Sequence, residues 1–172
     1  VVTINHRLNV FGYLALNHLG DAFAHAPVAG VLDMILALEW VRDNIAAFGG
    51  DPNTVMIFGE SGGGAKVSTL LATEKAKGLF HRAVVQSGAM LQFPDAQRAQ
   101  TAADQLIANL GLDQVSLPSL HAVSAEAIQA AAQGTSAGGA PTIDGSILTR
   151  HAFLPDAAPQ GKDVPLMLGT TR

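Results

Sequence analysis

The stretch Gly59-Glu60-Ser61-Gly62-Gly63-Gly64 restricts what this chain can fold into more than any other part of the sequence. It follows the apolar residues 55–58 and precedes the helix-forming residues 65–71, so it predicts a strand, a sharp turn and a helix in that order. A serine on such a turn needs an unusual backbone conformation, and the residues two before and two after it must be small because strand and helix run close together. Gly59 and Gly63 meet this requirement.

The predicted turn places Ser61 at the N-terminus of a helix. Free backbone N–H groups and the positive end of the helix dipole stabilise negative charge there, including the oxyanion that forms when a serine hydroxyl attacks an acyl carbon. The amide of Gly62 is expected to donate one of these hydrogen bonds. The stretch is therefore interpreted as a nucleophile elbow, with Ser61 as the nucleophile and Gly62 in the oxyanion hole.

Two phosphate-binding motifs use similar glycines with a different spacing. In a P-loop a Lys directly follows the second Gly, whereas Ala65 separates Gly64 from Lys66 in this chain. A dinucleotide-binding fingerprint needs a glycine where Ser61 stands. Both motifs are excluded, and no cofactor is expected. The remaining alternative is a glycine-rich turn between strand and helix whose serine has no chemical role.

The composition indicates an α/β protein with a large interior. Hydrophobic residues make up 48% of the 172 residues and charged residues 14%, against about 25% charged residues in typical soluble domains. Short apolar runs bounded by turn residues are typical of central strands in a parallel sheet covered on both faces. No run is long enough to predict a membrane span. The net charge of −4 is spread along the chain without a basic patch, so no nucleic-acid partner is expected.

Cysteine is absent from the sequence, which excludes disulfide bonds and thiolate zinc sites but leaves the cellular compartment open. The histidines have few acidic partners at ligand spacing, so no metal site is expected. The sequence begins at Val1 without a starting methionine or the pattern of a signal peptide. We expect any signal sequence to precede it, and the localisation stays unassigned.

Strands and helices are predicted to alternate over the first half of the chain, which implies a parallel sheet. Buried strands are expected at Val1–Asn5, 54–58 and 83–86, with a loop over residues 6–14 after the first strand. A helix is expected from Gly30 onward. Its predicted buried residues repeat at intervals of three and four: Val31, Ile35, Leu38, Val41, Ile45 and Phe48.

The composition changes after residue 88, where alanine and glutamine become frequent. Helices are expected at 95–109 and 124–133, followed by a glycine-rich loop and a final apolar strand at 165–169. We divide the chain into three parts of a single domain: residues 1–93, the core with the elbow; residues 94–140, a helical insertion or lid-side layer; and residues 141–172, the return to the sheet.

A set of motifs follows one another along the chain. They are Asn5-His6-Arg7-Leu8 with Phe11-Gly12, Ala29-Gly30-Val31-Leu32-Asp33-Met34, Ala37-Leu38-Glu39-Trp40-Val41-Arg42-Asp43-Asn44-Ile45, Phe48-Gly49-Gly50-Asp51-Pro52, Gly59-Glu60-Ser61, Gln86-Ser87-Gly88 and Ile143-Asp144-Gly145. In this order they resemble the type-B carboxylesterase family, which includes bacterial p-nitrobenzyl-type esterases and the cholinesterases. The resemblance covers nearly the whole chain and is strongest over residues 1–88.

The resemblance implies an α/β-hydrolase fold, here a partial, mostly parallel central sheet with helices on both faces. It also implies a serine carboxylic-ester hydrolase that acts on a small-molecule ester and forms an acyl-enzyme on Ser61. Glu60 would face the catalytic gorge, where a carboxylate supports a protonated histidine or orients water. The alternative for Glu60 is a buried residue with structural hydrogen bonds. The family often has alanine where Gly62 stands, but a glycine still offers its N–H.

The family's glycine-rich oxyanion loop lies before the motif at Asn5, and its acid and histidine follow the strand near residues 166–171. The chain is therefore interpreted as an internal fragment without these parts. Asp144 and His151 satisfy the order serine, acid, histidine within the chain. However, His81, His121 and His151 all lie in polar or loop-like sequence, where a solvated histidine is the simpler interpretation.

Two other functions stay open from the sequence. A non-catalytic relative of the same fold would act in protein recognition, but such relatives tend to lose the nucleophile, and Ser61 is present. Amide or peptide hydrolysis uses the same chemistry, and only the substrate pocket distinguishes it from ester hydrolysis.

The 172 residues expressed alone are predicted not to hydrolyse esters. Without an oxyanion loop, an acid and a histidine base, Ser61 keeps the weak nucleophilicity of an ordinary serine. The measurement is p-nitrophenyl acetate hydrolysis by the purified chain, with Ser61→Ala as the control. Saturable turnover that Ser61→Ala abolishes would contradict the prediction and indicate a working triad inside the chain, with Asp144 and His151 as the first candidates.

Overall fold

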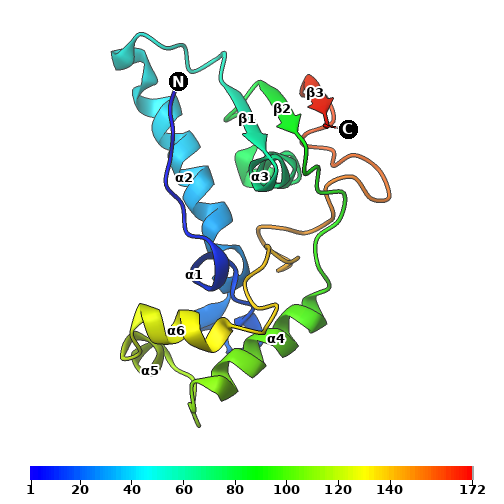
Figure 1. Cartoon of the computed structure of the whole chain (residues 1–172). Coiled ribbons are helices and arrows are strands. Elements are labelled where there is room, and N and C mark those ends of the chain that lie inside the picture. The colour runs from blue at the N-terminus through cyan, green and yellow to red at the C-terminus, as the bar shows by residue number, and fades with distance from the viewer. Residues whose placement is uncertain (172) are drawn as a thin grey trace. The chain divides into compact units, whose positions relative to one another are not determined.

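The computed structural model describes residues 1–171, and these form two compact units. We call the first the sheet unit; it contains Val1–Asn5, Val31–Phe93 and the chain from Gly145 onward. The second, the helical unit, contains His6–Gly30 and Pro94–Asp144. Figure 1 shows the elements of both units, coloured along the chain.

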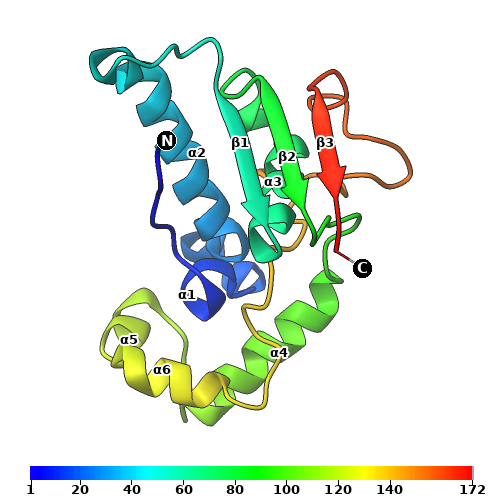
Figure 2. The ribbon, with the colours of Figure 1, turned by 45° about the horizontal axis from the view of Figure 1, so that its top comes forward.

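Three strands form the sheet of the first unit. They are β1 (Met56–Glu60), β2 (Arg82–Gln86) and β3 (Leu166–Gly169). Both pairings are parallel and the order is β1-β2-β3, so the three arrows of Figure 2 point the same way. The strands lie close to where the sequence predicts them. Because they are parallel, their carboxyl ends meet at one edge, where Glu60 is opposite Gln86 and Gln86 is opposite Gly169.

Helix α3 (Gly62–Leu71) begins directly after the turn at Ser61 and packs on β1 and β2. Its apolar residues Val67, Leu70 and Leu71 are buried, as is Val85 on the strand beneath. The short 3-10 turn η5 (Glu74–Ala76) then leads to β2. The parallel sheet and its crossover helix confirm the predicted α/β class.

The predicted helix from Gly30 is present as α2 (Ala29–Asn44), followed by a 3-10 turn, η4 (Ile45–Phe48). Four of the residues predicted to face the core are buried: Val31, Ile35, Leu38 and Val41. The prediction is wrong for the last two, since Ile45 is half-buried and Phe48 is 71% exposed. The 3-10 turn changes the period from 3.6 to 3.0 residues per turn, so the side chains after Asn44 rotate away from the buried face.

The strand predicted at Val1–Asn5 is wrong. No strand in the described part of the chain pairs with this segment, and Val2 and Ile4 are exposed. An apolar run becomes a strand only where a neighbouring strand accepts its backbone hydrogen bonds. The sheet of residues 1–171 offers no such neighbour at this position.

The loop predicted over residues 6–14 contains a short helix, α1 (Asn9–Tyr13). Its first residue, Asn9, has a φ of 46°, and its side-chain oxygen accepts a hydrogen bond from the N–H of Phe11 at 3.3 Å. Five residues are too few to show a helical period, so pattern reasoning could not find this helix.

Three further helices build the helical unit. They are α4 (Ala96–Asn109), α5 (Leu117–His121) and α6 (Ala125–Ala132). The Asp95 carboxylate caps α4 by accepting from the N–H of Arg98, and the Ser124 hydroxyl caps α6 in the same way. Helices α4 and α6 confirm the predictions, whereas the five-residue α5 is not predicted. The same unit contains the 3-10 turns η1 (Asn17–Leu19), η2 (Asp21–Phe23) and η3 (Ala26–Val28).

An apolar cluster forms the core of the helical unit. Its buried members from α1 and α4 include Val10, Leu106 and Ile107, and they pack with the segment that connects α1 and α2 through Phe23. The loop after α6 also packs closely on α1, because a Cβ at Gly138 would come within 2.3 Å of the backbone nitrogen of Val10. The unit is therefore held by packing between residues far apart in the sequence.

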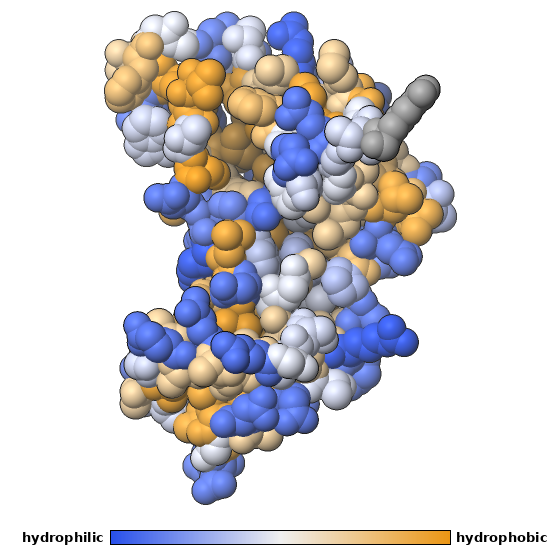
Figure 3. All heavy atoms as spheres, viewed as in Figure 1, coloured by the Kyte–Doolittle hydropathy of each residue, from blue (hydrophilic) through white to orange (hydrophobic). Residues whose placement is uncertain are grey.

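One face of the sheet leaves apolar side chains exposed. Phe58, Val84 and Met167 are opposite one another in the register, and Phe58 and Met167 are 56% and 69% exposed. Val85, on the alternate face beneath α3, is only 1% exposed. In Figure 3, orange apolar side chains are exposed on the sheet unit, with blue polar side chains between them.

Among the described residues, one helical stretch, Asp21–Phe48, is long and apolar enough to cross a membrane, and an 18-residue part of it has a mean hydropathy of 1.4. The sequence expectation that no run reaches this length is therefore not confirmed. Within the fold, 44% of that 18-residue part is buried. A core helix of a soluble protein passes the same test of length and composition, so the stretch is weak support for a membrane span.

Candidate active site

Ser61 lies on the sharp turn between β1 and α3, with φ 53° and ψ −115°. The expectation of an unusual backbone conformation is confirmed. A non-glycine residue in such a conformation costs on the order of 1–3 kcal/mol and persists only where its surroundings fix it. Two backbone hydrogen bonds do so: the Ser61 N–H donates to the Gln86 carbonyl at 2.9 Å, and the Ser61 carbonyl accepts from the Ala65 N–H at 3.1 Å.

Glycines are required around Ser61 because backbones touch there. A Cβ at Gly59 would lie 2.4 Å from the carbonyl carbon of Gly63, and a Cβ at Gly64 would lie 2.2 Å from the carbonyl oxygen of Ser87. A Cβ at Gly63 would meet open space. The sequence expectation is therefore right for Gly59 and wrong for Gly63, whose backbone crowds Gly59 but whose own position has room.

A second strained turn follows β2 and lies against the first. Ser87 and Gly88 have φ values of 61° and 67°, and a Cβ at Gly88 would be 2.1 Å from the Ser61 carbonyl oxygen. The Ser87 N–H donates to the Gly169 carbonyl at 2.7 Å, which joins this turn to β3. Ser61 thus sits where the carboxyl ends of parallel strands meet, the usual place for ligands in open α/β sheets.

Gly62 is the first residue of α3 and is exposed. The first amides of a helix have no acceptor within the helix, so this N–H is available as a donor. Four residues later, the ammonium of Lys66 donates to the Gly62 carbonyl at 3.2 Å. Burial lowers the pKa of Lys66 below its ordinary value. The first turn of α3 therefore combines the positive end of the helix dipole with a half-buried cation.

Glu60 is the last residue of β1 and is exposed in this chain. The alternative in which Glu60 is a buried residue with structural hydrogen bonds is not met in the described residues. Its carboxylate is adjacent in sequence to Ser61 at the edge where the strands end. A charge at this place acts on the site through space.

Two histidines considered as bases have structural hydrogen bonds instead. The Nδ1 atom of His151 accepts from the N–H of Phe93 at 3.0 Å, and that of His81 accepts from the N–H of Val55 at 3.2 Å. A triad histidine must donate from Nδ1 to its acid and accept at Nε2. Nδ1 atoms that accept backbone N–H groups hold the opposite tautomer, so these contacts disfavour both as the base.

Asp144 and His121 are the remaining candidates for an acid and a base within the chain. The Asp144 carboxylate is fully buried and lies 3.9 Å from Nδ1 of His25, a histidine that precedes Ser61 in the sequence. His121 is exposed at the end of α5. Over residues 1–171, no group of three or more His, Asp or Glu side chains is close enough to hold a metal ion.

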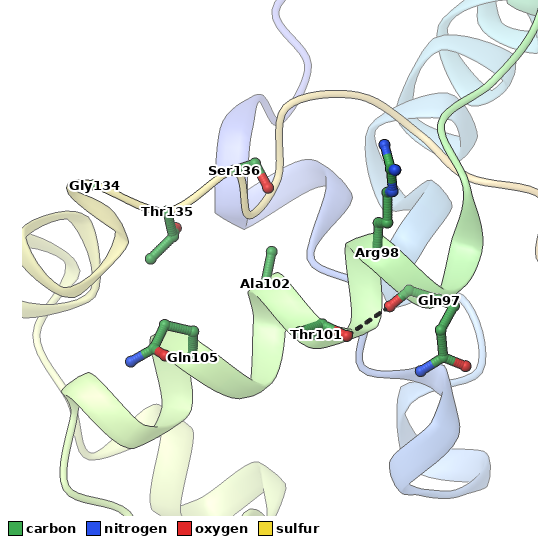
Figure 4. A pocket seen from close by; sticks show the side chains of 8 residues that line it. All are labelled: Gln97, Arg98, Thr101, Ala102, Gln105, Gly134, Thr135 and Ser136. Carbon is green, nitrogen blue, oxygen red and sulfur yellow. Dashed lines mark hydrogen bonds between the residues drawn. The ribbon is translucent and has the colours of Figure 1, made fainter.

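A hollow lies in the helical unit, between α4 and the loop after α6. Its volume is about 480 Å³ and it is open to solvent; Figure 4 shows the side chains that line it. The residues that line it come from α4 and the loop after α6: Gln97, Arg98, Thr101, Ala102, Gln105, Gly134, Thr135 and Ser136. One of these hydroxyls, that of Thr101, already donates to the Gln97 carbonyl of its own helix. The hollow contains none of the candidate catalytic residues.

A family model described as the carboxylesterase family matches residues 1–172. The chain belongs to the carboxylesterase family. It is 39% identical to the para-nitrobenzyl esterase of Bacillus subtilis over all of its own length and 36% of that protein's. It is 32% identical to an acetylcholinesterase of Leptinotarsa decemlineata, over 99% of this chain and 30% of that protein.

Solved structures of carboxylesterases share the fold. A carboxylesterase from Geobacillus stearothermophilus superposes with a TM-score of 0.89 at 37% identity, over 98% of this chain and 36% of that one. A structure titled PNB esterase gives a TM-score of 0.83 at 37% identity, over 98% of this chain and 37% of that one. The predicted carboxylesterase resemblance and the α/β-hydrolase fold are thus confirmed, and the chain spans 36% of the length of its Bacillus relative.

We predict that Gly59→Ala and Gly63→Ala differ sharply in stability. Alanine at position 59 forces its Cβ against the Gly63 backbone and lowers the free energy of unfolding by about 1–3 kcal/mol. Alanine at position 63 enters open space on a helix and is neutral or stabilises by up to about 1 kcal/mol. Thermal unfolding of the two variants measures the difference; equal melting temperatures would contradict the close approach of β1 and α3.

Proposed function

We propose that the protein that contains this chain is a serine carboxylic-ester hydrolase with Ser61 as its nucleophile. The observation that carries the proposal is the backbone of Ser61, held at φ 53° between a parallel strand and the N-terminus of a helix. Such a turn exposes the hydroxyl at the edge where strands end and puts helix amides beside it. Family membership supports the same reaction, because the relatives named above are esterases.

The proposed reaction uses the described residues in two roles. The Ser61 oxygen attacks the ester carbonyl carbon and its proton passes to a base, while the Gly62 N–H donates to the oxyanion that develops on the carbonyl oxygen. The alcohol then leaves with a proton from that base, and water hydrolyses the acyl-enzyme. The base, its acid and further oxyanion donors are proposed to come from parts of the protein outside residues 1–172. The substrate is proposed to be a small-molecule ester, without a cofactor.

Glu60 is proposed to support the site electrostatically. Its exposed carboxylate ends β1 beside Ser61 and stabilises a protonated histidine base by charge. A side chain next to Ser61 on a tight turn cannot reach the far nitrogen of a histidine that faces the serine. Glu60 is therefore not proposed as the triad acid.

The three-part division of one catalytic domain is also proposed. Residues 1–93 would carry the core and the elbow, residues 94–140 the helical insertion or lid-side layer, and residues 141–172 the return to the sheet. The helical unit contains Pro94–Asp144, close to the second part, together with His6–Gly30 from the first. This supports a separate helical layer and adds a segment of the N-terminal part to it.

We predict that a fluorophosphonate probe labels Ser61 in the full-length protein. The probe reacts with an activated serine and forms a stable adduct where the acyl group would bind. Peptide mapping of the adduct and the rate of p-nitrophenyl acetate hydrolysis are the measurements. Ser61→Ala should remove both.

Other outcomes would point to the competing functions. Labelling at a different serine would reject Ser61 as the nucleophile. A folded protein that is neither labelled nor active would favour a recognition domain without catalysis. Labelling of Ser61 with turnover of amides but not of esters would favour an amide hydrolase.

Glu60→Gln is predicted to lower kcat only partly. The change removes a charge near the base and keeps the shape of the side chain, whereas removal of a triad acid costs on the order of 10⁴ in kcat in the serine-protease template. Steady-state kinetics of the full-length variant, compared with Ser61→Ala, measure the loss. A decrease in kcat of about 10⁴ would assign Glu60 a larger role than the one proposed.

A further inference from the structure

The segment of residues 87–90 follows β2 and presses on the backbone of Ser61. Gly88 lies so close that a Cβ there would be 2.1 Å from the Ser61 carbonyl oxygen and 2.6 Å from its carbonyl carbon. Ser87, a residue with a side chain, has a φ of 61°, so this segment is itself strained. A strained segment needs contacts that hold it in place. One such contact comes from the helix that starts at the elbow.

That contact is the hydroxyl of Ser68. Ser68 lies on α3 with 0% of its surface exposed. Its hydroxyl O–H donates to the Gly64 carbonyl at 3.1 Å, and its oxygen accepts from the N–H of Met90 at 3.3 Å. A serine hydroxyl has one proton and two lone pairs, so both bonds form at once. Ser68 thereby joins α3 to the 87–90 segment, 22 positions away from it in the sequence.

The neighbouring Thr69 offers a comparison on the same helix. Its side chain is also buried, at 1% exposure, and its hydroxyl donates to the Ala65 carbonyl at 2.9 Å. This bond stays within α3 and repeats the bond from Ser68 to Gly64. The hydroxyl of Ser68 differs from that of Thr69 because it also accepts from the N–H of Met90.

We propose that Ser68 is a positioning residue for Ser61: it holds the 87–90 segment against the Ser61 backbone and so keeps the nucleophile in its positive-φ conformation. The inference rests on the proposed function of Ser61. Ser68 acts through the contact of Gly88 with Ser61 and does not touch the reacting atoms itself. Since Gln86, which precedes this segment, accepts from the Ser61 N–H, movement of the segment also disturbs that bond.

The expected effect is on reaction rate. A misplacement of a reacting group by about 1 Å lowers a rate by as much as about 100-fold. Ser68→Ala removes the acceptor for Met90, frees the segment and lets Ser61 depart from its strained conformation. Substrate binding depends on other parts of the protein, so KM should stay nearly constant. A residue with a purely structural role would lower the melting temperature without changing the kinetics of the folded enzyme.

The test compares Ser68→Ala with Thr69→Val in the full-length protein. Both changes remove a buried hydroxyl and its bond within α3, but only Ser68→Ala removes the bond to Met90. For Ser68→Ala we expect kcat for p-nitrophenyl acetate and the rate of fluorophosphonate labelling to fall by about 10-fold to 100-fold. Hydrogen exchange at the Met90 amide should become faster. Thr69→Val should keep the wild-type kcat, labelling rate and Met90 exchange, although its melting temperature falls.

The outcomes separate this inference from the proposed function. If wild-type protein is not labelled at Ser61, the proposed function fails and this inference fails with it. If the wild type is labelled and Ser68→Ala reacts as fast as Thr69→Val, only this inference is overturned. Should Ser68→Ala fail to fold, Ser68→Cys decides, because the thiol nearly keeps the side-chain size and accepts hydrogen bonds weakly. A wild-type labelling rate in Ser68→Cys with faster Met90 exchange would also overturn the inference.

Discussion

The close approach of three backbone segments around Ser61 is the constraint on which the rest of the sheet unit depends. The end of β1, the first turn of α3 and the segment after β2 meet with no side chain between them at Gly59, Gly64 and Gly88. Because these backbones have no room for a Cβ between them, they fix how α3 packs across β1 and β2. They also hold Ser61 in a conformation that an isolated peptide would avoid. The parallel sheet and its crossover helix thus together hold Ser61 in its strained conformation.

Local sequence patterns predicted the strands and helices that carry the candidate site. Predictions were wrong where contacts between residues far apart in the sequence, or the hydrogen bonding of the backbone, decide the conformation. The three strands are short apolar runs bounded by turn residues, and α4 and α6 begin at the capping residues Asp95 and Ser124. The glycines around Ser61 mark the turn between β1 and α3. Val1–Asn5 has the composition of a strand, but composition does not show whether a neighbouring strand is present. Phe48 follows the helical period, yet the helix tightens into a 3-10 turn before reaching it. These misses arise where hydrogen bonding, rather than residue type, decides the conformation.

The residues of the candidate site also fall into those that the sequence indicated and those that only the structure shows. The motif alone singled out Ser61, Gly62 and Glu60. It did not reveal the roles of Gly88 and Ser68, because their contacts join residues far apart in the sequence. Gly88 belongs to the motif Gln86-Ser87-Gly88, but the motif does not show that Gly88 lies against Ser61. His151 is the opposite case: its place in the sequence suits a triad, but its Nδ1 atom accepts a backbone N–H. Sequence order alone is therefore a poor guide to the base, since a base is defined by its hydrogen-bond partners.

The pairing of Trp40 with Phe48 has a spectroscopic consequence. Trp40 is the single tryptophan of the chain and lies on α2 in the sheet unit, 47% exposed, with its ring centroid 5.7 Å from that of Phe48 in η4. Within this chain, intrinsic tryptophan emission therefore comes from the sheet unit and is silent about the helical unit. Because the indole is half-exposed, its emission responds to solvent around the end of α2. Trp40 is therefore an intrinsic fluorescent probe of the sheet unit alone.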